Sequence, residues 1–211
     1  MSAITPETRP GSPSPRVRPP AAAFPDLLWP LSVEQYHAMI DADILTEDDP
    51  VELLGGYLVP KMPKKPPHRL ATGLLREALE RILPAGWYVD SQEPVTTGDS
   101  EPEPDVMVVK GSRRQYADRH PGSSDLGLVV EVSDATLERD RTLKMRLYGA
   151  AGIPLYWVVN LPERQIEVFT LPGKDGGVGY GEHRILRPGD EVILLLDGQE
   201  AGRIAVRDLL P

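Results

Sequence analysis

The sequence contains no cysteine, and this absence excludes disulfide bonds, thiolate zinc sites and cysteine nucleophiles. Any metal ion must therefore be bound by oxygen atoms or by the four histidines. The sequence also lacks an apolar run of about eighteen residues, the length that a transmembrane helix needs, and its N-terminus lacks the basic and then apolar pattern of a signal peptide. We therefore expect a cytoplasmic protein that does not span a membrane.

Basic residues are in short supply, with 23 lysines and arginines against 32 aspartates and glutamates and a formal net charge of -9. This balance opposes nucleic-acid binding through overall positive charge. Net charge averages over the whole surface, however, and carboxylates gathered around a divalent cation would lower it without excluding a local basic path. Three local basic clusters are present: Lys61, Lys64, Lys65 and Arg69; Arg113, Arg114, Arg119 and His120; Arg139, Arg141, Lys144 and Arg146. Ordinary solvated charge is the alternative explanation for each cluster.

Several catalytic motifs are missing. There is no Gly-x-Ser-x-Gly elbow, no glycine-rich dinucleotide turn, no Walker lysine motif and no His-Glu-x-x-His pair. These absences disfavour serine hydrolases, nucleotide-binding folds and zinc peptidases. A glycosidase with paired carboxylates stays open, although aromatic residues, the usual stacking platforms for sugars, make up 6% of the chain.

The chain of 211 residues, 40% of them hydrophobic, is long enough for one domain with a sizeable core. Residues 1–30 contain eight prolines among small and polar residues, so we expect a disordered tail there and one domain over 31–211. Apolar spacing and turn residues predict the following order: a helix from Ser32, two strands about a Gly-Gly turn in 51–59, a helix over 68–83, strands at 87–90, 105–109 and 126–132, a helix over 137–150, a strand at 155–159, and β-rich segments from 165 onward. This order predicts an α/β or α+β fold with a mixed sheet, helices on its faces and a C-terminal β-rich segment.

Two carboxylates are the first candidates for a site. Asp105 begins one apolar strand and Glu131 lies near the end of the next, so antiparallel pairing would bring both to one edge of the sheet. Glu131 also interrupts the apolar run Leu-Val-Val-Glu-Val, and a buried carboxylate needs a partner, a metal ion or a shifted pKa. Magnesium ions are typically held by one or two carboxylates. We therefore predict a metal site at Asp105 and Glu131, against the simpler interpretation of solvated strand charges.

Three further residues complete the candidates. Lys144 shares a helical stripe with Leu137, Arg141 and Tyr148, and from there its charge would stabilise a reacting phosphate. A solvated lysine paired with Asp140 is the alternative. Two second-rank candidates are Glu52, as a further carboxylate on a strand where glutamates are usually solvated, and His68, at a helix start, as a phosphate contact or acid.

An ordered set of motifs resembles the bacterial Uma-type restriction endonuclease family of the PD-(D/E)XK nuclease superfamily. The resemblance spans about residues 32–171 and weakens through the C-terminal β segment. Its motifs are Val51-Glu-Leu-Leu-Gly-Gly, Pro-Pro-His68, Glu-Pro-Asp105-Val, Leu-Val-Val-Glu131-Val-Ser, Arg-Asp140-Arg-x-x-Lys144, and Tyr148-x-x-Ala-Gly-Ile-Pro-x-Tyr-Trp157-Val-Val.

The resemblance implies a restriction-endonuclease-like core and a metal-dependent endonuclease that hydrolyses phosphodiester bonds in DNA. It implies Mg²⁺ or Mn²⁺ at the positions that match Asp105 and Glu131, for which we add the backbone carbonyl of Val132 as a further ligand. The family pattern has a lysine two residues after the glutamate, where this chain has Ser133. Lys144 on the next helix matches the lysine that reaches the same space.

The early hairpin also departs from the family pattern. Family members often have Asp-Gly-Glu there, whereas this chain has Gly55-Gly56-Tyr57, so Glu52 is the remaining matching carboxylate. Two other functions stay open: a degenerate member of the fold that binds nucleic acid or protein without cutting, and a hydrolase of small phosphoesters or sugars. A homodimer is compatible with the sequence, since paired subunits often cut the two strands of a duplex.

Overall fold

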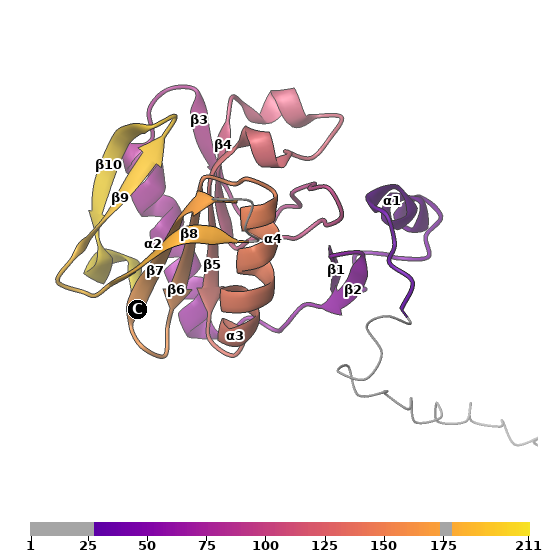
Figure 1. Cartoon of the computed structure of the whole chain (residues 1–211), viewed down its shortest axis with the longest axis horizontal. Coiled ribbons are helices and arrows are strands. Elements are labelled where there is room, and N and C mark those ends of the chain that lie inside the picture. Colours follow the sequence, from indigo (N-terminus) through magenta and orange to yellow (C-terminus); the bar gives the residue numbers. More distant parts are fainter. Residues whose placement is uncertain (1–27, 174–178) are drawn as a thin grey trace, which may run out of the picture.

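The computed structural model describes residues 28–173 and 179–211 (Figure 1). The predicted tail, residues 1–30, lies almost entirely outside the described residues. The remainder forms a six-stranded sheet with helices on both faces, and a small N-terminal lobe at one side. None of the helices in the described ranges has the length and apolar content needed to cross a bilayer.

The sheet is mixed, as predicted. Only the β5–β6 pair is parallel among its neighbouring strands, and the other pairs are antiparallel. The parallel pair is connected by a helical crossover, the connection that parallel strands require. In spatial order the strands are β3 (Trp87–Asp90), β4 (Val106–Lys110), β5 (Leu126–Ser133), β6 (Leu155–Asn160), β7 (Gln165–Pro172) and β8 (Tyr180–Leu186).

Two apolar layers cover the central strands, which explains why β5 and β6 are buried along their whole length. On one face, the helix α2 (Pro66–Ile82) packs through Leu75 and Leu79 against β4 to β6. The hairpin of β9 (Glu191–Leu196) and β10 (Gln199–Ala205) joins the same layer. On the other face lie α3 (Leu137–Arg139), a π-helical turn (Asp140–Lys144) and α4 (Met145–Ala150) (Figure 1).

The N-terminal lobe, defined here as residues 31–60, consists of α1 (Val33–Asp41), β1 (Val51–Leu54) and β2 (Tyr57–Pro60). Ser32 caps α1 as predicted, with its side chain accepting a hydrogen bond from the Gln35 N–H. The predicted Gly-Gly turn joins the two strands, and both glycines adopt positive φ. The lobe has a small apolar cluster of its own and joins the sheet domain through backbone pairing of Leu53 with Glu101.

Most predicted elements appear with shifts of one to three residues. The α2 helix begins at Pro66, two residues before the predicted start, because proline suits the first turn of a helix. The helix predicted over 137–150 is present, but a π-helical turn replaces its middle. The predicted glycine-rich stretch around 173–181 lies partly outside the described residues, and β8 to β10 follow it.

Candidate active site

Antiparallel pairing of β4 and β5 brings Asp105 and Glu131 together, as the sequence predicts. Val106 pairs with Val130, so Asp105, just before β4, lies beside Glu131 in β5. Both carboxylates are buried, with 5% and 4% of their surface exposed. Burial of two charged groups at one end of the strands demands compensation by hydrogen bonds or cations.

Asp105 is held from two directions. Its Oδ2 accepts hydrogen bonds from Nε2 of His68, at 3.0 Å, and from the backbone N–H of Val132, at 2.9 Å. Its Oδ1 lies 3.2 Å from the Lys64 ammonium. Burial by itself raises the pKa of Asp105, but the bond and charge of His68, the charge of Lys64 and the Val132 bond outweigh it and lower the pKa. These contacts therefore favour the ionised form of the Asp105 carboxylate.

Glu131 has a different environment. Its Oε1 accepts hydrogen bonds from Lys144 Nζ, at 2.9 Å, and from the Tyr148 hydroxyl, at 2.7 Å. Burial is the largest effect and raises the pKa of Glu131 to about 8; Lys144 opposes this rise, whereas the nearby carboxylates of Asp105 and Asp140 add to it. Glu131 is therefore protonated more readily than a solvated glutamate.

Lys144 is buried rather than solvated. Its ammonium lies between Glu131 and Glu52, 3.2 Å from Glu52 Oε2, and 3% of its side chain is exposed. Burial lowers the pKa of Lys144, but the charges of Glu131 and Glu52 raise it by more, so the net shift is upward and the side chain stays an ammonium. The expectation that a strand glutamate is solvated is wrong for Glu52, because the lobe places β1 directly against the cleft.

Asp140 belongs to the same cluster. The hydroxyls of Ser133 and Thr136 donate to its Oδ2 at 2.7 and 2.6 Å. Its Oδ1 is buried and has no hydrogen-bond partner among residues 28–173 and 179–211. Ser133, at the position where the family pattern has a lysine, therefore anchors the π-helical turn whose other end is Lys144.

The helical stripe predicted for Lys144 is divided in the structure. Lys144 and Tyr148 face Glu131, whereas Arg141 binds Glu167 in β7 through its guanidinium. The π-helical turn causes this division, because the extra residue changes which side chains share a face. Sequence reasoning missed Asp140 as a site residue and named Tyr148 only as part of the stripe.

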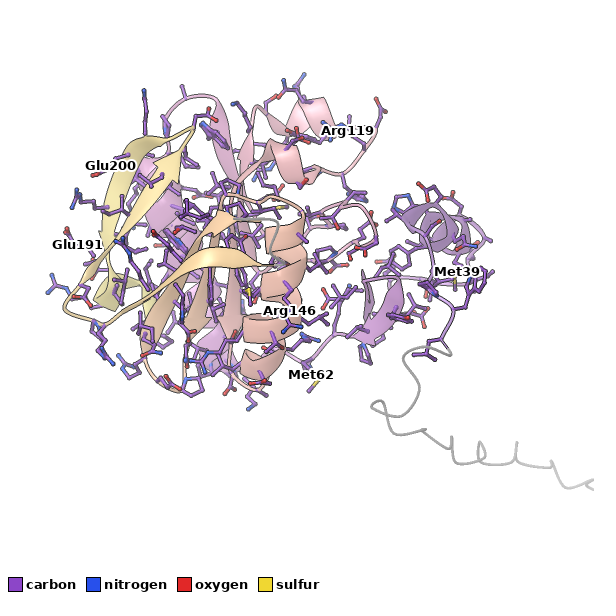
Figure 2. All side chains as sticks on the ribbon, in the orientation of Figure 1. Met39, Met62, Arg119, Arg146, Glu191 and Glu200 are labelled. Carbon is purple, nitrogen blue, oxygen red and sulfur yellow. The ribbon has the colours of Figure 1, made fainter. Side chains whose placement is uncertain are left out.

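A cleft of about 330 Å³ lies between the N-terminal lobe, the start of α2 and the π-helical turn, and its lining includes Glu52, His68, Asp105, Glu131, Asp140 and Lys144. A short connection between β2 and α2, residues 61–65, passes along its rim; we call it the lysine segment. The Met62 side chain labelled in Figure 2 marks where it passes beside α3. The rim is therefore basic and the floor acidic, an arrangement that suits a phosphate above a cation.

The oxygen ligands of the cleft suit a hard divalent cation. No three histidine or carboxylate side chains form a ready-made metal site in the part of the chain that the structure describes. Magnesium, however, needs only one or two carboxylates and retains several waters. Asp105 and Glu131 supply that number of carboxylates in one cleft. The ligand role of the Val132 carbonyl stays a prediction.

Comparison with known proteins agrees with this geometry. Among solved structures, the chain is similar to a putative nuclease belonging to DUF820 from Anabaena variabilis ATCC 29413, with 15% sequence identity and a TM-score of 0.62. That similarity covers 85% of this chain and 97% of the other and confirms the predicted fold class. No curated protein matches the chain. A family model described as Uma2, putative restriction endonuclease, matches residues 33–206. The chain therefore belongs to the Uma2 family of putative restriction endonucleases, as its motifs predict.

Proposed function

We propose that this protein is an endonuclease that depends on Mg²⁺ or Mn²⁺ and hydrolyses phosphodiester bonds in DNA. The observation that carries the proposal is the convergence of Asp105, Glu131 and Lys144 in one cleft, two buried carboxylates with a buried ammonium between strand and helix. Family membership supports nuclease chemistry in general. The metal and the DNA substrate are the specific content of the proposal.

Asp105, Glu131 and the carbonyl of Val132 are the proposed cation ligands. A bound divalent cation supplies positive charge against the phosphate oxygens and makes water a competent nucleophile at neutral pH. His68 and the Val132 N–H fix the orientation of the Asp105 carboxylate. This second layer of hydrogen bonds is what keeps a ligand in place for binding.

Lys144 has the electrostatic role. Its ammonium is held by Glu52 and Glu131 at a fixed place in the cleft, so no reorganisation is needed when negative charge accumulates on the phosphate. Tyr148 donates to the same oxygen of Glu131 and restricts that carboxylate further. In this proposal Glu52 is a positioning residue for Lys144, and its part as a further carboxylate of the site stays a prediction.

The test is cleavage of plasmid, single-stranded DNA and RNA with Mg²⁺ or Mn²⁺ by the wild type and by Asp105→Asn, Glu131→Gln and Asp134→Asn. Asp134 is a matched control because it lines the same cleft but pairs with Lys65. We expect losses of about 100-fold or more for the first two variants, and activity near wild type for Asp134→Asn. Circular dichroism checks that each variant is folded.

Two outcomes contradict the proposal in different ways. Cleavage that survives in Asp105→Asn would assign the activity to another site or to a contaminant. A wild type that binds DNA but cuts no substrate would indicate the degenerate binding protein. Preference for small phosphoesters over duplex DNA in a competition assay would instead favour the small-molecule hydrolase.

A further inference from the structure

We propose that Lys64 is an exchangeable cation: its ammonium neutralises Asp105 in the free protein, and divalent-cation binding releases it to bind a phosphate of the nucleic acid. This inference rests on the proposed function. It begins with the lysine segment, in which each lysine pairs with a different acidic residue of the cleft. The pairs are Lys61 with Glu103, Lys64 with Asp105, and Lys65 with Asp134.

The two oxygens of Asp105 have different partners. Oδ2 accepts from His68 and from the Val132 backbone, both in buried parts of the fold. Oδ1 has the Lys64 ammonium at 3.2 Å, and 41% of the Lys64 side chain is exposed. A partly exposed lysine pair is weak, because solvent screens it and its long side chain loses entropy when it is held. Oδ1 is therefore the oxygen from which a stronger cation can displace its partner.

Lys144 does not fit the exchanging role. Its side chain is 3% exposed and is fixed by Glu131 and Glu52 from two elements. Separation of Lys144 from these two carboxylates would leave buried charges without a partner, which is costly. Displacement of Lys64 moves an ammonium from the rim of the cleft toward water or toward a phosphate, and this costs little.

The start of α2 makes Lys64 the natural phosphate contact after release. Pro66 and Pro67 occupy the first turn of the helix and have no N–H to offer an anion. Attraction of a phosphate at this point therefore depends on side-chain charge. Lysine provides it as a compact ammonium with three donors, and Pro63 and Pro66 limit how far the backbone on either side of Lys64 and Lys65 can move.

Cation affinity without nucleic acid is the first test. Mn²⁺ binding is measured by calorimetry and by the shift in Tm for the wild type, Lys64→Met, and Lys65→Met as a control of equal charge from the same segment. We expect Lys64→Met to bind Mn²⁺ about tenfold more tightly, since no ammonium competes for Asp105. Lys65→Met should remain within about twofold of the wild type, because only long-range charge changes.

The outcomes separate this inference from the proposed function. Binding by the wild type with no gain in Lys64→Met overturns the exchange and leaves the metal site intact. Binding by Lys64→Met but not by the wild type overturns the exchange, because the cation then fails to displace Lys64, and it leaves the carboxylates as a metal site that Lys64 blocks. Absence of binding in both proteins overturns the exchange together with the proposed metal site.

A second arm tests the released lysine. Affinity for a labelled DNA duplex is measured by fluorescence anisotropy with and without Ca²⁺, a cation that prefers oxygen ligands, and a gel checks that the duplex stays intact. We expect Lys64→Met to weaken DNA binding about fivefold with Ca²⁺ and to change it less than twofold without, because Asp105 holds Lys64 when no cation is bound. An equal loss under both conditions would overturn the transfer to phosphate.

Discussion

The buried ammonium of Lys144 allows a sharp test of the site through stability. Lys144→Met keeps much of the side-chain volume but removes the charge that lies 2.9 Å from Glu131 and 3.2 Å from Glu52. The three side chains are exposed by 3%, 5% and 3%, so water cannot replace the lost partner. Removal of one partner from a buried ion pair typically costs about 3–5 kcal/mol.

Glu131 sets the pH dependence of that cost. Its pKa is raised to about 8, so Glu131 is largely protonated at neutral pH and the loss of Lys144 leaves less uncompensated charge. We therefore expect Lys144→Met to lower the free energy of unfolding by about 3 kcal/mol at pH 7. Lys144 lowers the pKa of Glu131, so Lys144→Met raises it further. As the pH rises through about 8, the wild type ionises Glu131 and the variant does not. The gap must therefore grow, by about 1 kcal/mol up to pH 9.

Urea unfolding at pH 7 and pH 9 measures the loss of stability and its growth with pH, and it is followed by tryptophan fluorescence, to which the buried Trp157 contributes. Lys110→Met is the control, because Lys110 pairs with Asp197 at 2.8 Å but both side chains are more than half exposed. We expect that variant to lose less than about 1 kcal/mol of its free energy of unfolding. A loss of the same small size for Lys144→Met, or a loss that shrinks as the pH rises, would refute a buried ammonium.

Two further predictions concern the packing of the π-helical turn and of α4. Gly149→Ala should cost about 1–3 kcal/mol in urea unfolding, since its Cβ would lie 2.3 Å from the Gly179 carbonyl oxygen; an unchanged midpoint would contradict this close approach. Glu167→Gln should cost about 2 kcal/mol by removing the buried carboxylate that binds Arg141, which keeps only its longer contact with Glu163. The pKa of Glu167 is lowered from 4.5, so its contribution is fully present above that pH and is lost as the pH falls through the lowered pKa; the difference from wild type should vanish in stronger acid.

The sheet and the carboxylate pair were predictable because both depend on local patterns. Short apolar runs rich in β-branched residues indicated β4 and β5, and the position of Asp105 and Glu131 along those strands fixed which end they would share. The burial of Glu131 followed from the apolar residues on either side of it. Helix α2 was equally predictable, because its apolar residues recur at intervals of three and four positions.

The surroundings of Lys144 were not predictable, because they depend on contacts between distant segments. Glu52 reaches Lys144 from a hairpin that precedes it by more than ninety residues, and no local pattern encodes that contact. The π-helical turn likewise follows from tertiary anchors, the hydroxyls on Asp140 and the Arg141–Glu167 pair. A straight α-helix drawn through 137–150 places Arg141 and Lys144 on one face, and the structure separates them.

The net charge of -9 no longer opposes DNA binding once its distribution is considered. The N-terminal lobe, residues 31–60, has seven acidic residues and no lysine or arginine, so the rest of the chain carries only -2. Within the lobe, Glu52 is buried against Lys144, whereas the other acidic residues are exposed. If the protein binds DNA as proposed, the exposed acidic residues of the lobe would repel the polyanion and the lysine segment along the cleft would attract it. Under the proposed function, this charge distribution would direct a phosphate backbone toward the side of the cleft where Lys64 lies.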